Sequence, residues 1–177
     1  MKRFVLGMLV VLLTLGGLGV AVHTVGADSA KRLPTFDMKD LEERDHSLSD
    51  DDFKNKKLLV AAFSTWQQVS IDQARELEAF HKAHPEVEII AFVCDDLPAA
   101  RDFVKREGLS FPVYKADNTN TANSSFGRVF ETKKGQVLTL NRAPFVILTD
   151  KDRYVRFSNV GLTGSAKLGE ELAKIAD

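Results

Sequence analysis

Three short, largely apolar runs stand out in the pattern of hydrophobic and polar positions, at residues 58–63, 87–93 and 145–148. Runs of this length and composition are typical of strands that are covered on both faces. Residues 154–157 alternate between apolar and polar side chains and follow an acidic turn at residues 150–152. The pattern therefore predicts three buried strands and an antiparallel neighbour for the last of them.

Helical spacing of apolar residues separates these runs. Residues 69–83 carry Ile71, Ala74, Leu77, Phe80 and Ala83 at helical intervals, and Pro85 ends the pattern. Two further helices are predicted over residues 98–107, closed by Gly108, and 166–175. The order strand, helix, strand, helix, strand, strand, helix predicts an α/β fold with helices on both faces of a mixed central sheet. The polar residues 115–126 predict a surface loop.

The N-terminal segment has a different character from the rest of the chain. Lys2 and Arg3 form a basic head, residues 4–22 carry no charge, and small residues at 25–27 resemble a cleavage site. This pattern predicts export, and it leaves two outcomes open. Residues 1–27 are removed as a signal peptide, or they are kept as an N-terminal membrane anchor, because the uncharged run is nearly long enough to span a bilayer. Residues 28–32 are then a linker, and residues 33–177 form one domain.

Composition excludes several classes of function. The chain has 24 basic and 25 acidic residues, so it lacks the basic excess expected of a nucleic-acid-binding protein. It has one cysteine, Cys94, and therefore no intrachain disulfide, no dithiol redox centre and no multi-cysteine zinc site. We predict no metal and no cofactor.

Several short segments of the sequence resemble segments of one protein family, and they occur in the same order along the chain. They are Leu33 to Met38, the run that ends in Ala62-Phe63-Ser64-Thr65-Trp66, the run from Arg142 to Asp150, and Gly161. Together they resemble the TlpA/ResA/redoxin branch of the thioredoxin-like proteins over residues 33–177. The resemblance implies a three-layer thioredoxin-like fold. The position of Ala143-Pro144, just before an apolar strand, predicts a cis peptide bond there.

The departures from this family bear directly on function. Alignment on Trp66 places Gln67 and Ser70 where the family has its two cysteines, and Gln73 where it has a glutamate. Disulfide exchange needs a thiolate to attack and a second thiol to resolve the mixed disulfide. A glutamine amide cannot attack, and a serine without an adjacent base is a poor nucleophile. The sequence therefore predicts a degenerate, redox-inactive site.

Two other kinds of chemistry remain to be weighed. Cys94 ends the second predicted strand and could act as a lone redox thiol, which makes a monothiol redox enzyme or sensor the alternative function. A buried cysteine with a packing role is the competing interpretation. His81 and His84 lie one helical turn apart, but no third ligand is evident in the sequence.

The family resemblance also implies a surface around the former active site. Trp66, Gln67, Gln68, Ala143 and Pro144 would surround it, and they are our predicted partner-binding residues. An exposed backbone beside the proline could pair with an extended peptide, and Trp66 could supply a strong contact. A relic surface with no role is the other interpretation. We predict a redox-inactive binding or accessory module in the cell envelope, acting on a protein partner or as a subunit of a membrane complex.

Overall fold

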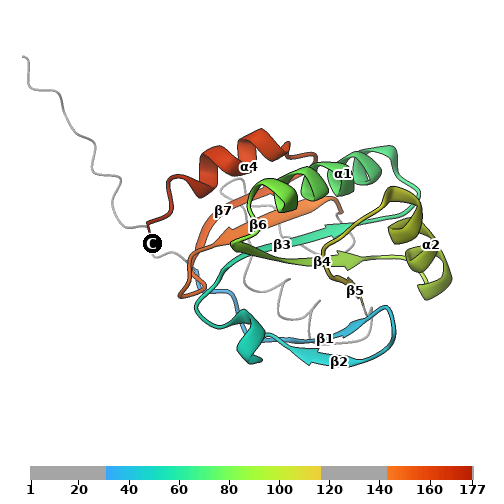
Figure 1. Ribbon diagram of the computed structural model, residues 1–177, viewed down its shortest axis with the longest axis horizontal. Coiled ribbons are helices and arrows are strands. Elements are labelled where there is room, and N and C mark those ends of the chain that lie inside the picture. Colours follow the sequence, from blue (N-terminus) through green and yellow to red (C-terminus); the bar gives the residue numbers. More distant parts are fainter. Residues whose placement is uncertain (1–30, 117–142, 177) are drawn as a thin grey trace, which may run out of the picture.

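The computed structural model describes residues 31–116 and 143–176 (Figure 1). The predicted signal or anchor segment, residues 28–30 of the predicted linker and residues 117–126 of the predicted loop lie outside this range. None of the helices in the described residues is long and apolar enough to cross a membrane.

Seven strands form one mixed sheet. They are β1 (Asp37–Asp40), β2 (Asp45–Ser47), β3 (Lys57–Phe63), β4 (Val87–Val93), β5 (Val113–Lys115), β6 (Phe145–Thr149) and β7 (Val155–Val160). Their order across the sheet is β2-β1-β5-β4-β3-β6-β7. The central pairs β3–β4 and β4–β5 are parallel, and the four outer pairs are antiparallel. The predicted mixed α/β fold is confirmed, but the prediction of helices on both faces is not met within residues 31–116 and 143–176, where the α-helices all pack on one face of the sheet.

The sheet separates two apolar clusters. Helices α1 (Gln68–Ala83), α2 (Leu97–Glu107) and α4 (Ser165–Leu172) all contribute buried side chains to the first cluster. Figure 1 shows α1 and α4 side by side over the same face of the sheet. On the other face, within the described residues, the lead-in segment with Phe36, Met38 and Leu48 packs on the sheet together with the short 3-10 helix η1 (Asp51–Phe53).

Local sequence signals account for both ends of α2. Asp96 caps α2 by accepting a hydrogen bond from the Ala99 amide, and Gly108 ends the helix with a positive φ of 66°. The structure corrects the sequence prediction at three places. Lys115 belongs to β5 rather than to a loop, α4 ends at Leu172 rather than at residue 175, and Ala83 is exposed rather than part of the core.

The two ends of the sheet have different surroundings. The carboxyl ends of β3 and β4 lie together, because Phe63 pairs with Val93. We call this the site end, since the predicted site residues follow β3. Strand β6 runs antiparallel to β3 and pairs Leu148 with Leu59. The β6–β7 turn at residues 150–154 therefore lies at the opposite end, which we call the hairpin end.

Candidate functional site

The turn that follows β3 displays Trp66 to solvent. Asp95, which follows the end of β4, accepts a hydrogen bond from the Thr65 amide through its Oδ2 at 2.5 Å. The Cys94 amide donates to the carbonyl oxygen of Phe63 at 3.1 Å. These two bonds fix the backbone on both sides of Ser64. The side chain of Trp66, two residues later, is 71% exposed. An exposed fraction this large shows that Trp66 is not a packing residue of the core.

Gln67 and Ser70, at the former cysteine positions, have structural surroundings. Gln67 is half-buried and immediately precedes α1, and its carbonyl oxygen accepts from the amides of Ser70 and Ile71. Ser70 is fully buried, and its hydroxyl lies 3.3 Å from that of Ser64. A hydroxyl group is activated as a nucleophile by a neighbouring base, and another serine is not one. This pair therefore has the geometry of a packing contact.

Gln73, at the family's glutamate position, ties α1 to the loop before α4. Its side-chain amide donates to the Thr163 carbonyl oxygen at 3.1 Å, and its Oε1 accepts from the Thr163 amide at 2.7 Å. Both residues are buried. An ionised glutamate could accept but not donate here, so the neutral amide suits the site in a way that the family's carboxylate would not.

Cys94 lies beside this turn but is poorly suited to redox chemistry. Its half-buried side chain packs against the cluster on the lead-in face of the sheet. Burial, together with the negative charge of Asp95, raises the pKa of the thiol to about 12. Since the thiolate is the reactive form, only about one molecule in 10⁵ would carry it at pH 7.

The Ala143–Pro144 peptide bond is cis, as predicted from the sequence. Pro144 is buried and Ala143 is half-buried. The Pro144 carbonyl oxygen accepts a hydrogen bond from the Gly161 amide at 2.8 Å. This carbonyl is therefore already paired within the chain.

An exposed apolar surface, of which the sequence predicted only Trp66, occupies the site end. It consists of Trp66, Val69 and Leu162, whose exposed fractions are 71%, 41% and 48%. Val69 lies one helical turn before Gln73, and Leu162 directly precedes Thr163, so both border the Gln73–Thr163 contact. We call these three residues the Trp66 patch. The only sequence signal for it is an apolar side chain in the first turn of α1 and another just after Gly161.

The remaining predicted partner-binding residue, Gln68, is exposed next to this patch. Its amide donates to Asp72 Oδ1 at 2.8 Å. Of the five predicted residues, the structure thus exposes Trp66 and Gln68, half-buries Gln67 and Ala143, and buries Pro144.

His81 in the last turn of α1 and His84, the residue that caps the helix, lie away from the Trp66 patch. His81 places its ring edge against Phe111, and His84 contacts the Glu86 carboxylate at 3.2 Å. Across residues 31–116 and 143–176, no three His, Cys, Asp or Glu side chains come together in a metal-binding arrangement.

Comparisons with known proteins agree with this architecture. The chain resembles a DsbF homologue from Corynebacterium diphtheriae with a TM-score of 0.68 and 18% identity, over 86% of this chain and 97% of that one. It resembles a thiol:disulfide interchange protein from Chlorobium tepidum with a TM-score of 0.67 and 17% identity, over 82% and 95% of the two chains. A secreted thiol-disulfide isomerase from Corynebacterium glutamicum gives a TM-score of 0.65 and 21% identity, over 81% and 85%.

These identities establish the shared thioredoxin-like fold. No curated protein sequence matches the chain. Residues 28–170 match the Redoxin family, and this match covers most of the chain. The chain is therefore a member of the Redoxin family with a single cysteine, and it lacks the family's thiol pair.

Proposed function

We propose that this protein is a redox-inactive thioredoxin-like module that acts by binding a protein partner in the cell envelope. The observation that carries the proposal is the exposed Trp66 patch at the end of the sheet where the thiol pair is missing. A large exposed aromatic residue is of the type enriched at interaction hot spots. Gln67 and Ser70 cannot perform thiol chemistry, so binding is the property of this surface that remains.

Location outside the cytoplasm is the second part of the proposal. It rests on the basic head, the uncharged run and the small residues of the N-terminal segment. The similar structures include proteins described as secreted, from Mycobacterium tuberculosis and Corynebacterium glutamicum. An accessory subunit of a membrane complex would meet its partner in this compartment.

The redox part is tested by insulin reduction. We expect the purified chain to show only background turnover, because it holds no second cysteine to resolve a mixed disulfide. A Gln67→Cys/Ser70→Cys chain, with the dithiol rebuilt at the former positions, serves as the comparison. If the native chain reduced insulin and Cys94→Ser did not, the result would contradict this proposal and support a monothiol enzyme.

The binding part is tested by partner recovery from solubilised cell envelopes, with identification by mass spectrometry. We expect Trp66→Ala to lower recovery of a specific partner at least tenfold while the Tm changes by a few degrees at most, because the side chain is exposed. Lys54→Ala is the control, since Lys54 is exposed and belongs to no surface proposed to bind a partner. Equal recovery with native chain and Trp66→Ala would show that the patch does not bind.

A further inference from the structure

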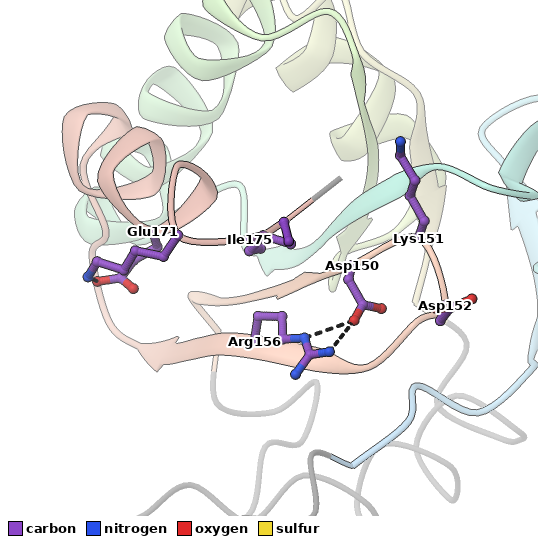
Figure 2. A pocket seen from close by; sticks show the side chains of 8 residues that line it. Asp150, Lys151, Asp152, Arg156, Glu171 and Ile175 are labelled. Carbon is purple, nitrogen blue, oxygen red and sulfur yellow. Dashed lines mark hydrogen bonds and ion pairs between the residues drawn. The ribbon is translucent and has the colours of Figure 1, made fainter. Parts of the chain in front are cut away.

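A cavity of about 550 Å³ lies at the hairpin end, between the β6–β7 turn and the end of α4 (Figure 2). Its lining holds three acidic and three basic side chains, and four of these form two ion pairs. Arg156 donates to Asp150 Oδ2 through Nε at 2.8 Å and through its terminal nitrogen at 2.5 Å. Lys174 lies 2.7 Å from the Glu171 carboxylate. Because these charges cancel, the cavity itself offers little attraction to a charged ligand.

The surface that continues from this cavity shares Lys151 and Arg156 with it, and over that surface positive charge exceeds negative charge. The chain that enters the domain lies along the start of β7, with Arg32 bridged to Tyr154 and the Val155 amide donating to the Lys31 carbonyl oxygen. This contact brings together two segments that are far apart in the sequence. We call the result the basic face; it consists of Lys31, Arg32, Lys151, Arg153, Tyr154 and Arg156.

Three of these cations meet neutral groups or solvent instead of carboxylates. Arg32 Nε donates to the Asp152 carbonyl oxygen at 2.9 Å, and Arg153 donates to the Thr35 hydroxyl at 3.3 Å. Lys31 is exposed to solvent. Residues 31–32 and 150–156 hold five basic and two acidic side chains, a net charge of +3 in a chain whose total is −1.

Retention of residues 4–22 as a membrane anchor would keep this face close to a bilayer. Eight residues, 23–30, separate the uncharged run from Lys31, and even when fully extended they reach at most about 28 Å. A chain held by residues 4–22 would therefore keep the basic face at a high local concentration beside the lipid headgroups. Each Lys or Arg near an anionic surface adds to the electrostatic attraction. Tyr154, 40% exposed and beside the Arg156 guanidinium, is of the amphipathic type enriched at this depth.

We propose that the basic face docks on an anionic phospholipid surface and turns the Trp66 patch away from it. The proposal rests on the export part of the proposed function, takes residues 4–22 as a retained anchor, and adds an orientation. The β3 strand, about 23 Å long, lies between the two ends of the sheet. With the hairpin end on the membrane, the Trp66 patch faces the aqueous compartment, where it can meet the water-exposed part of a partner.

The test uses the full chain reconstituted into two kinds of vesicle, phosphatidylcholine alone and equal parts of phosphatidylcholine and phosphatidylglycerol. Hydrogen exchange of residues 150–156 and acetylation of Lys151 report on the basic face. We expect both to slow about tenfold in the anionic vesicles and to recover in high salt. Acrylamide quenching of Trp66 should be equal in the two vesicles, because the patch points away from the lipid.

Adjacent basic pairs provide matched variants. Lys31→Gln/Arg32→Gln should abolish most of the protection, whereas Lys105→Gln/Arg106→Gln on α2 removes the same charge and should keep it. Circular dichroism checks that both variants are folded. Equal exchange in both vesicle types, or protection of Trp66 instead of the hairpin, would overturn the proposal. So would equal protection by soluble glycerol phosphate, which would assign the face to single phosphates. Partner recovery through Trp66 is measured separately, so failure here leaves the proposed function standing.

Discussion

Gln73 exchanges two hydrogen bonds with the backbone of Thr163, a residue 90 positions later in the chain. The pair joins α1 to the loop that leads into α4. Glu76 adds a parallel contact one turn later, because its Oε2 accepts from the Ser165 amide at 2.6 Å. The loop before α4 is therefore held by the same helix that begins at the former active site.

This relationship predicts the cost of restoring the family's glutamate. Gln73→Glu replaces a donor with a second acceptor and places a carboxylate at a fully buried position. We expect the free energy of unfolding at pH 7 to fall by about 2–3 kcal/mol, measured by urea denaturation. The deficit should shrink as the pH is lowered, because a protonated carboxyl can donate to the Thr163 carbonyl oxygen. Gln67→Glu, at a half-buried position, is the control, and an equal loss there would contradict the argument.

Trp66 is the only tryptophan in the chain, so its fluorescence reports directly on the exposed patch. We expect the folded protein to emit at a wavelength close to that of tryptophan in water, with little further red shift in urea, since the side chain is 71% exposed. Acrylamide should quench the folded protein nearly as well as the unfolded chain. A blue-shifted, protected emission would show that Trp66 is covered in solution.

Cys94 should react slowly with thiol reagents in the folded state. Burial raises its pKa from 9.0 to about 12, which lowers the thiolate population at pH 8 by roughly a thousandfold. We expect labelling by a disulfide reagent to be slow at pH 8, to accelerate as the pH rises toward 12, and to be rapid in denaturant. Rapid labelling of the native protein at neutral pH would revive the monothiol function.

Asp40 is expected to make the protein sensitive to acid. Its burial would raise the pKa of the carboxyl group, but hydrogen bonds from His46 and from the Arg44 amide and guanidinium outweigh this effect and hold the pKa well below 3.8. The folded state therefore gains stability above about pH 4, and this gain is lost as the pH falls further.

The Asp40→Asn variant tests this linkage. We expect it to lower the free energy of unfolding by about 2 kcal/mol at pH 7 and to flatten its decline between pH 4 and pH 2. Asp37→Asn, an exposed change in the same strand, should stay within about 0.5 kcal/mol of the native protein. Urea titrations at several pH values supply the measurement. An Asp40→Asn chain with the native pH slope would show that another group controls acid unfolding.

The sequence predicted the elements whose signals are long or locally complete. The apolar runs of β3, β4 and β6 and the capped α2 were found because their own residues specify them. Strand β5 was missed because it has three residues, and its pairing with Ala91 to Val93 is what makes it a strand. The buried Gln73 was missed as a structural residue because its partner, Thr163, is distant in sequence.

The candidate site could be predicted only in part, for the same reason. The loss of the thiol pair follows from residue identity alone, and the exposure of Trp66 agrees with one of the two interpretations that the sequence left open. Val69 and Leu162 lie on separate elements, and only the fold shows that both border the Gln73–Thr163 contact. The basic face likewise depends on the β-bridge between Arg32 and Tyr154, which no local sequence pattern predicts.

The strand order determines how early the sheet can form during synthesis of the chain. β3 pairs with β6 through residues such as Leu59 and Leu148, and β1 reaches β5 by pairing Lys39 with Lys115. A growing chain therefore has no complete sheet until residues beyond Leu148 have been synthesised. Until then, the apolar strands that become the core are open to wrong contacts, so we expect this sheet to fold only after β6 and β7 have been synthesised, and to fold slowly.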